Sequence, residues 1–469
     1  MVPAVAIPEG RTTARHWATR IVLDRLFKEW VVEAGASAEW QIGARDSSGG
    51  RLPGELRLSD AFFRGAEGPW LATESMPTLP LPTFEPSAFG IHPKVTASTI
   101  PVLFGQSTLS GFGTDRIELG IDIFGSAFFM LSRYEEIVVS TKDRLGRFPA
   151  SESVAHKAGF LGRPLIDEYA EILWEVMRMM WPGLARKRTR SQVLPSHDVD
   201  EPSRDAFRGL RAVLKESAGD LLKRHRVRRA IQGPWHWLHG QIALHPRDAY
   251  NTFDRLMDLS DSQGTKSTFF FMAGESNPAF DRAYRLGHPA IRRLMRRIHD
   301  RGHEIGLHPS FETFRDAGLL TQEADRLRDM LRRIGVRQDR LGARMHYLRW
   351  SMPETWRAMV RAGLDFDASL GFADMAGFRC GTCHQYRAFD VQAGQPLDLE
   401  VRPLIAMDVT VMDEQYMGLG TSSQAHDLLC KLRERCESVG GSFSILWHNN
   451  EFVRPGSWDL YRNALGANS

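Results

Sequence analysis

Short apolar runs alternate with amphipathic segments along the chain from about residue 186 onward. The segments between the runs have helical spacing, as in Ile291, Leu294, Met295 and Ile298, which follow the i, i+3, i+4, i+7 pattern of a helix with one buried face. Strands that alternate with helices predict a parallel sheet, either open or rolled into a barrel. We expect these strands at residues 193–197, 267–272, 303–308, 341–347, 366–371, 397–405 and 442–448.

The first part of the chain, residues 1–185, has a different pattern. It contains no group of His, Asp, Glu or Cys with the spacing of a metal site or an active site. We therefore predict a separate α+β accessory domain at 1–185, which supports the chemistry or selects the substrate, and a second domain at 186–469 that carries the chemistry. Its periodicity predicts helices at residues 14–32, 128–137 and 166–180, and a strand at 117–123.

Composition and charge narrow the class of protein. The 469 residues are 42% hydrophobic and 25% charged, with a net charge of only +3, which argues against a nucleic-acid binder. No apolar run approaches the roughly 20 residues of a membrane-spanning helix. The first nine residues also lack the basic start and long apolar core of a signal peptide. Four cysteines are too few for a disulfide scaffold, so we expect a cytoplasmic protein.

Polar residues cluster where the predicted strands end. Asp198 and Asp200 close the first strand, and because residues two apart lie on one face of a strand, a single cation or a shared proton could hold both carboxylates. An isolated Asp-x-Asp is equally typical of a capped turn. However, His308, Arg344 and His448 also follow strands. Strand ends of a (β/α) barrel converge on one face, so together these residues predict an active site.

These residues carry a resemblance to a known family. Ser196-His-Asp-Val-Asp200, Gly302-His-Glu-Ile-Gly-Leu-His308, Arg344-Met-His-Tyr347 and Leu446-Trp-His448 resemble, in order, the motifs of polysaccharide deacetylases, the NodB-homology carbohydrate esterases. The chain looks most like the bacterial branch with a long N-terminal domain that is often found in capsule and exopolysaccharide loci. The resemblance implies a distorted (β/α)7 barrel that holds one divalent metal ion and removes N- or O-acetyl groups from a sugar.

The resemblance also implies a role for each site residue. Asp198 corresponds to the general base, Asp200 to a metal ligand and His308 to the first metal histidine. His448 corresponds to the acid that protonates the leaving group, and Arg344 to the arginine that pairs with the base. A backbone N–H near Tyr347 would hold the oxyanion, so Tyr347 is expected to lie against the substrate.

The third metal ligand remains open between two residues. Most of the family has a histidine four residues after the first, where this chain has Glu312. In a helical turn His308 and Glu312 would lie on one face, so Glu312 could replace that histidine. His346, two residues after Arg344, is the alternative. The resemblance implies zinc, and a carboxylate-rich site would also suit manganese or iron; a site without metal is a further alternative.

A Cys-x-x-Cys-His string at Cys380, Cys383 and His384 has the form of a c-type haem attachment site. We reject haem, because such attachment occurs in exported proteins. A zinc site at these residues is an alternative, although no second Cys-x-x-Cys is present. We expect instead a loop over the active site, with Arg379 and Tyr386 reaching the substrate.

An insertion after the first strand, residues 203–240, is rich in Arg and Lys and contains Trp235 and Trp237. One interpretation is a clamp on an anionic glycan or a lipid-linked phosphate, or a contact with a membrane surface. The preferred interpretation is a solvated helical hairpin whose tryptophans pack on the barrel.

The sequence thus predicts a metal-dependent hydrolase that removes acetyl groups, N- rather than O-linked, from a sugar or polysaccharide precursor. Two alternatives remain. Some barrels of this family open cyclic amides without a metal, and a degenerate deacetylase domain could bind glycan without catalysis.

Overall fold

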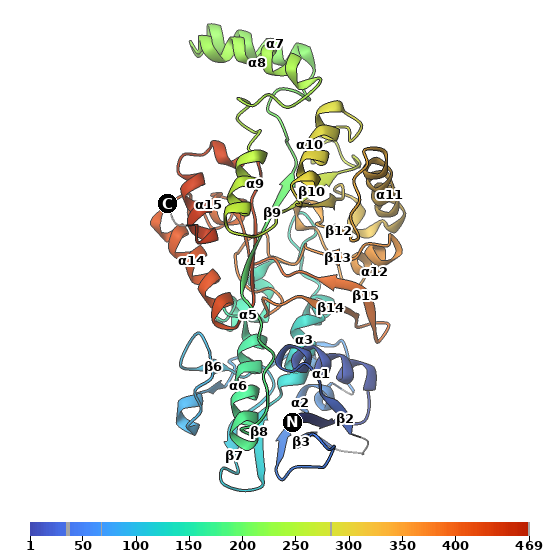
Figure 1. The fold of residues 1–469 in the computed structure, drawn as a ribbon, viewed down its shortest axis with the longest axis vertical. Helices are drawn as coiled ribbons and strands as arrows, with labels where there is room; N and C mark the ends of the chain where they lie inside the picture. Colours follow the sequence, from blue (N-terminus) through green and yellow to red (C-terminus); the bar gives the residue numbers. More distant parts are fainter. Residues whose placement is uncertain (34–37, 67, 282–283, 468–469) are drawn as a thin grey trace.

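The computed structural model describes residues 1–33, 38–66, 68–281 and 284–467. The molecule is elongated, with the N-terminal part at one end and a helical hairpin at the other (Figure 1). Its strands form two main sheets, and no helix in the described ranges is long and apolar enough to cross a membrane.

The first sheet belongs to the N-terminal part and has six strands in the order β2-β1-β3-β4-β8-β7, with mixed pairing. Trp40, Phe62 and Phe128 are fully buried between this sheet and its helices. The strands are β1 (Val2–Ala6), β2 (Val31–Glu33), β3 (Trp40–Arg45), β4 (Glu55–Leu58), β7 (Gly105–Ser110) and β8 (Arg116–Ile121), and β5 (Thr83–Phe84) pairs separately with β6 (Ile100–Pro101). The helices are α1 (Thr12–Leu26), α2 (Ala61–Gly65), α3 (Ile123–Leu131), α4 (Glu135–Val138), α5 (Val154–Lys157) and α6 (Leu165–Met180).

The second sheet has nine strands in the order β14-β15-β13-β12-β11-β10-β9-β17-β16. All neighbours are parallel except β14 and β15. The mixed α/β class with a parallel sheet is therefore confirmed. The strands are β9 (Gln192–Val199), β10 (Thr268–Met272), β11 (Glu304–His308), β12 (Gly342–Ala343), β13 (Phe366–Asp367), β14 (Tyr386–Asp390), β15 (Gln395–Val401), β16 (Ala406–Met407) and β17 (Ser442–Leu446).

The two ends of the parallel sheet approach each other through one short segment. The N–H of Arg402 donates to the carbonyl of Asp367, the last residue of β13 (2.8 Å), and the N–H of Leu404 donates to the carbonyl of Leu370 (3.1 Å). The next residue, Ile405, donates instead to Ser444 of β17 (3.1 Å). The sheet is therefore strongly rolled, although its strand pairing among the described residues does not close into a continuous barrel.

Amphipathic helices cover the outside of the rolled sheet (Figure 1). In α10, Ile291, Leu294, Met295 and Ile298 are all buried, as their spacing predicts, and Pro289 occupies the first turn, where its missing N–H costs nothing. The helices are α9 (Phe253–Ser262), α10 (Pro289–Asp300), α11 (Ala317–Arg333), α12 (Glu354–Arg361), α13 (Asp408–Met412), α14 (Ser423–Ser438) and α15 (Ser457–Leu465). The insertion forms the hairpin α7 (Leu210–Leu222) and α8 (Val227–Gly240).

The two parts of the chain share one continuous buried core. Arg379 from the second part forms a buried ion pair with Glu136 from the first part (2.6 Å). The guanidinium of Arg133 also donates to the carbonyl of Arg379 (2.5 Å). The predicted boundary at 185/186 falls between the last helix of the first part, α6, and β9; that the first part is a separate domain stays a prediction.

Several predicted elements have different bounds. The helix predicted at 14–32 ends at Leu26, and residues 31–33 form an edge strand instead. The helix predicted at 128–137 is two helices, because Arg133 has a left-handed backbone (φ 55°) that interrupts it. The strand predicted at 341–347 has only two residues, and its remainder forms the turn that carries part of the candidate site.

Candidate active site

The polar residues singled out in the sequence come together at the carboxyl ends of the parallel strands. Asp198 is the second-to-last residue of β9 and Asp200 directly follows the strand, while His308 is the last residue of β11. His346 follows β12, and His448 follows β17. The parallel pairing places these strand ends at one edge of the sheet, as expected for an active site of an α/β protein.

One carboxylate and two imidazoles form a group that could hold a metal ion. Asp200, His308 and His346 each offer a ligand atom, and the three atoms lie within 4.8 Å of one another. Asp200 Oδ1 is 3.2 Å from His308 Nε2, and Asp200 Oδ2 is 3.9 Å from His346 Nε2. Ligand atoms that each lie about 2 Å from one ion are separated by about 3 to 4 Å, so the spacing fits a bound cation.

Both imidazoles are oriented through their other ring nitrogen. His308 Nδ1 donates to the carbonyl of Arg344 (2.6 Å), and His346 Nδ1 donates to Asp281 Oδ1 (3.0 Å). Such partners fix the tautomer that presents Nε2 to a metal. Asp200 Oδ1 and His308 Nε2 are buried without a well-aligned hydrogen bond among the described residues. Buried polar atoms rarely lack a partner, and a cation would supply one here.

Burial and neighbouring charge act in opposite directions on Asp200. Burial favours the neutral acid, but the adjacent His308 imidazole and the nearby His346 and His448 outweigh it and lower the pKa of Asp200 below its usual value. The carboxylate is therefore ionised, as a metal ligand must be.

Asp281, which sequence analysis did not identify, supports His346 from behind. Its carboxylate accepts hydrogen bonds from the backbone N–H groups of Ser276 and Asn277 (both 2.8 Å) and of Phe311 (2.8 Å). Burial tends to raise the pKa of Asp281, but the hydrogen bonds from His346 and these N–H groups lower it to about 2. Asp281 lies in a loop without periodicity, so no pattern along the chain pointed to it.

Asp198 is held by an arginine at the bottom of the site. Arg344 Nη1 lies 3.2 Å from Asp198 Oδ1 and 2.8 Å from Ser196 Oγ, and Arg344 Nε donates to the carbonyl of Ala368 (3.0 Å). All of these side chains are buried. The other oxygen, Asp198 Oδ2, is 3.7 Å from His308 Nε2. The structure thus brings the predicted base next to the predicted metal ligands.

His448 lies on the opposite side of Asp200 and is fixed by Asp408. Its Nδ1 donates to Asp408 Oδ1 (2.8 Å), its backbone N–H donates to Asp408 Oδ2 (2.6 Å), and its Nε2 is 3.7 Å from Asp200 Oδ2. Burial tends to lower the pKa of His448, but Asp408 and the two site aspartates raise it to about 10. His448 is therefore a protonated imidazolium that can give a proton. Sequence analysis missed Asp408, although it directly follows a strand end.

The other predicted ligand, Glu312, lies outside this group. Its side chain is half exposed and faces Arg349 Nη1 (3.4 Å) and Asn277 Nδ2 (3.3 Å). The chain after His308 does not form the helical turn that the prediction required. Of the two candidates, the geometry therefore favours His346 over Glu312.

Tyr347 forms part of the mouth of the site. It has a left-handed backbone (φ 57°) and a partly exposed ring (38%). The ring lies 4.4 Å from that of His346 and edge-on to Phe280 and Phe311. Arg147, from the N-terminal part, donates to the carbonyl of Tyr347 (3.0 Å). The first part of the chain therefore braces the loop that carries His346 and Tyr347.

Arg379 and Tyr386, the two substrate contacts predicted near the cysteines, do not lie at the mouth of the site. Arg379 is 2% exposed, and its guanidinium is bonded to Glu136 and to the carbonyl of Gly371. Tyr386 is 4% exposed and packs edge-on to Trp17 of α1. Both side chains lie in the contact between the two parts of the molecule, and neither is among the residues that line the cavity at Asp200, so the structure gives no support to a substrate contact for either.

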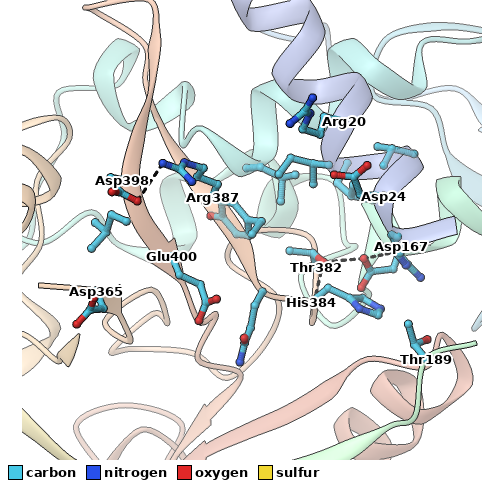
Figure 2. A pocket seen from close by; sticks show the side chains of 18 of the residues that line it. Arg20, Asp24, Asp167, Thr189, Asp365, Thr382, His384, Arg387, Asp398 and Glu400 are labelled. Carbon is cyan, nitrogen blue, oxygen red and sulfur yellow. Dashed lines mark hydrogen bonds and ion pairs between the residues drawn. The ribbon is translucent and has the colours of Figure 1, made fainter. Parts of the chain in front are cut away.

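A cavity of about 880 Å³ lies apart from the candidate site and is bordered by Tyr386 but not by Asp200 or His308. It is lined by Arg20 and Asp24 of α1 and by residues that precede strands of the parallel sheet, including Thr189 and Asp365 (Figure 2). It therefore lies at the opposite end of the sheet from the site. The site opens instead into a cavity of about 370 Å³ lined by Asp200, Pro202 to Arg204, Phe207 and Tyr284, among others.

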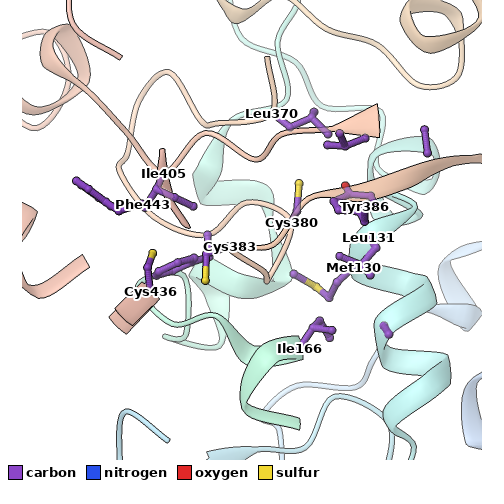
Figure 3. Close-up of a cluster of buried hydrophobic side chains, with 14 of the residues drawn as sticks. Met130, Leu131, Ile166, Leu370, Cys380, Cys383, Tyr386, Ile405, Cys436 and Phe443 are labelled. Atoms are coloured by element: carbon purple, nitrogen blue, oxygen red, sulfur yellow. The ribbon is translucent and has the colours of Figure 1, made fainter. Parts of the chain in front are cut away.

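The Cys-x-x-Cys segment is part of the core rather than a loop over the site. Cys380 and Cys383 are buried and free, beside Met130 and Ile166 of the first part (Figure 3). Asp167, Cys383 and His384 form a second group with metal-like spacing. However, Asp167 already pairs with Arg25 (2.5 Å) and accepts from Thr382 (2.6 Å). Burial, with Cys436 and Asp167 nearby, raises the pKa of Cys383 well above its usual value, so the thiol stays protonated.

Comparisons with known proteins add two similarities of fold and one of sequence. Residues 74–182 match the model of a family of unknown function, DUF7033. No curated protein matches the chain. A crystal structure described as a "putative polysaccharide deacetylase" from Mycobacterium smegmatis is 19% identical, with a TM-score of 0.37 over 60% of this chain and 84% of that one. Puue allantoinase is 16% identical, with a TM-score of 0.34 over 61% of this chain and 85% of that one. The function proposed below rests on the geometry of the site itself.

Proposed function

We propose that the protein is a metal-dependent hydrolase that removes acetyl groups from an acetylated sugar or polysaccharide precursor, with N-acetyl favoured over O-acetyl. The observation that carries the proposal is that three parts lie together at the carboxyl ends of the strands. They are Asp198 paired with Arg344, the group of Asp200, His308 and His346, and the protonated His448. The three parts provide a base, a metal site and an acid within a few ångströms of each other.

The metal would be held by Asp200, His308 and His346, and zinc is the metal that we propose. Catalytic zinc sites commonly have three protein ligands of His and carboxylate type and one open position. The same ligand types also suit iron or manganese. When bound, such an ion lowers the pKa of a water molecule and polarises a carbonyl group.

The protein's own groups perform the proton transfers. Asp198, whose orientation is fixed by Arg344, accepts the proton of the attacking water. His448, on the other side of Asp200, donates its proton to the leaving amine or alcohol. Asp408 keeps that histidine protonated and oriented. The backbone N–H of Tyr347 is the proposed donor to the oxyanion, and its ring offers a face for a sugar.

The test is release of acetate from a panel of N-acetylated and O-acetylated amino sugars and their short oligomers, after the purified protein is loaded with zinc, manganese or iron. Asp198→Asn keeps the shape of the base but removes its function. We expect turnover to fall by about 10³-fold, while the bound metal stays constant. The matched control, Asp398→Asn, alters an exposed aspartate that pairs with Arg387 on the surface and should keep full activity. Absence of acetate release from every substrate and metal would overturn the proposal. Release of a ring-opened acid from a cyclic amide by metal-free protein would favour the alternative hydrolase.

A further inference from the structure

The hairpin of α7 and α8 carries an unusual share of the exposed apolar surface. It stands away from the rest of the molecule at one end of the long axis (Figure 1). Trp235 is 53% exposed, so the prediction that the tryptophans pack on the barrel is wrong for this residue. Of seventeen large apolar side chains that are exposed in the described residues, nine belong to the hairpin and the turn after it: Leu210, Leu214, Leu221, Leu222, Val227, Ile231, Trp235, Leu238 and Ile242.

Five of these side chains form one stripe along α8 and into the turn that follows it. Val227, Ile231, Trp235, Leu238 and Ile242 are spaced by three or four residues, which places them within an arc of roughly 80° on a helix of 3.6 residues per turn. Such a stripe normally faces a core. Here it is exposed along its whole length, so it lacks a partner within the described chain.

The opposite face of α8 is the one that packs on the protein. His236 and Gly240 are buried on that face. Gly240 lies so close to Ala206 that a Cβ added at Gly240 would be 2.2 Å from the Cβ of Ala206. This contact is with the insertion itself, and the exposed stripe is the side of α8 that it leaves in solvent.

The hairpin is also the main concentration of positive charge. Residues 203–240 contain nine Lys and Arg against three acidic residues, a net charge of +6, whereas the whole chain has +3. Some of these cations pair with Glu216 or Asp220. Among the ion pairs of the described residues, none involves the exposed side chains of Arg211, Lys215, Lys223, Arg226 and Arg228.

We propose that this hairpin docks onto a membrane surface that contains anionic lipids. An apolar stripe with a tryptophan, flanked by Lys and Arg, is the combination that lies in the headgroup region of a bilayer. A nucleic acid would satisfy the charges but leave the apolar stripe in water. A second copy of the hairpin would cover the stripe but bring two clusters of like charge together.

Docking would place the mouth of the candidate site beside the membrane. The site cavity is lined by Asp200 and also by Arg204, Phe207, Arg208 and Glu216, which belong to the base of the hairpin and to α7. A sugar carried on a lipid anchor would reach Asp200 without leaving the surface. This consequence rests on the proposed function, whereas docking itself does not.

The experiment is flotation of the full-length protein with vesicles of phosphatidylcholine alone, or of phosphatidylcholine and phosphatidylglycerol in equal parts. We expect binding to the anionic vesicles that weakens as salt is raised. Ile231→Ser, Trp235→Ser and Leu238→Ser together should weaken it by at least about tenfold. Arg226→Glu with Arg228→Glu should abolish the preference for anionic vesicles. Phe112→Ser with Val453→Ser removes exposed apolar side chains elsewhere and should bind like the wild type.

Thermal unfolding of each variant shows whether it is folded, which is expected because all of the altered side chains are exposed. The proposal is wrong if the wild type does not float with anionic vesicles at low salt, or if the apolar triple variant floats as well as the wild type. It is also wrong if the wild type does not bind vesicles and light scattering shows that the wild type is a dimer whereas the triple variant is a monomer. In that case a second copy covers the stripe. Acetate release from soluble sugars is independent of all these outcomes, so the two proposals fail separately.

Discussion

Three groups of side chains among the described residues have the spacing of a metal site, and two of them, one at the strand ends and one in the core, differ in their partners. In Asp200–His308–His346 and in Asp167–Cys383–His384 the ligand atoms lie within 4.8 Å of one another. Asp200 Oδ1 and His308 Nε2 lack aligned hydrogen bonds, whereas both oxygens of Asp167 are used, by Arg25 and Thr382 on one side and by Cys383 on the other. Spacing alone therefore does not identify a metal site. The better indicator is a set of buried ligand atoms that have no hydrogen-bond partner within the protein.

The largest expected effect separates the two groups by activity. His308→Ala removes a metal ligand, so acetate release should fall by at least about 10³-fold, which corresponds to about 4 kcal/mol of transition-state stabilisation. His384→Ala alters the other group and should leave turnover unchanged within about twofold, because no reacting group touches it. Steady-state kinetics measures the turnover of both variants. An equal loss of turnover in the two would contradict the functional difference between the two groups.

The second prediction concerns stability. Asp167→Ala removes a buried carboxylate that pairs with Arg25 and accepts hydrogen bonds from Thr382 and from the backbone N–H of Cys383, so the free energy of unfolding should fall by about 3 to 5 kcal/mol. Urea denaturation followed by circular dichroism measures this. Asp398→Ala is the control, since its ion pair with Arg387 is exposed and should contribute nothing measurable. An Asp167→Ala protein as stable as the wild type would mean that Asp167 is not the structural centre described here.

The third prediction tests the acid through its pH dependence. His448 is active only when protonated, and Asp408 helps to raise its pKa to about 10. Asp408→Asn removes a negative charge, so the pKa of His448 falls and the alkaline decline of activity moves to lower pH. Turnover should also drop by about 10²-fold, because the imidazole loses its orientation. A pH–rate profile that drops uniformly, without moving along the pH axis, would contradict the role given to Asp408.

The smallest effect distinguishes the two candidate ligands. Glu312→Ala should change activity and metal content by less than about twofold, because Glu312 faces Arg349 and solvent. His346→Ala, its matched partner, should lose metal. A loss of metal in Glu312→Ala that His346→Ala does not share would restore Glu312 as the ligand.

Much of the parallel sheet could be predicted because each strand is a short apolar run followed by a polar residue at its end. The strands near 193–197, 267–272, 303–308 and 442–448 lie where the pattern placed them. The edge strand β14 was missed, because it pairs antiparallel with β15 beside the Cys-x-x-Cys segment and does not follow the strand–helix alternation.

Those residues of the candidate site that lie at strand ends could be predicted from the sequence. Asp198, Asp200, His308 and His448 met that condition, and the structure brings them together. Arg379 looked like a substrate contact because sequence cannot show that its partner, Glu136, lies 243 residues earlier in the chain. Asp281 was missed for a similar reason, since its function depends on His346, 65 residues away.

The most direct test of the account is the metal content of the purified protein, measured by elemental mass spectrometry for the wild type, Asp200→Ala and Asp167→Ala. We predict close to one divalent ion per chain in the wild type, its loss in Asp200→Ala and its retention in folded Asp167→Ala. A wild type that stays empty after reconstitution with zinc, manganese or iron would contradict the account. So would an Asp200→Ala protein that holds as much metal as the wild type.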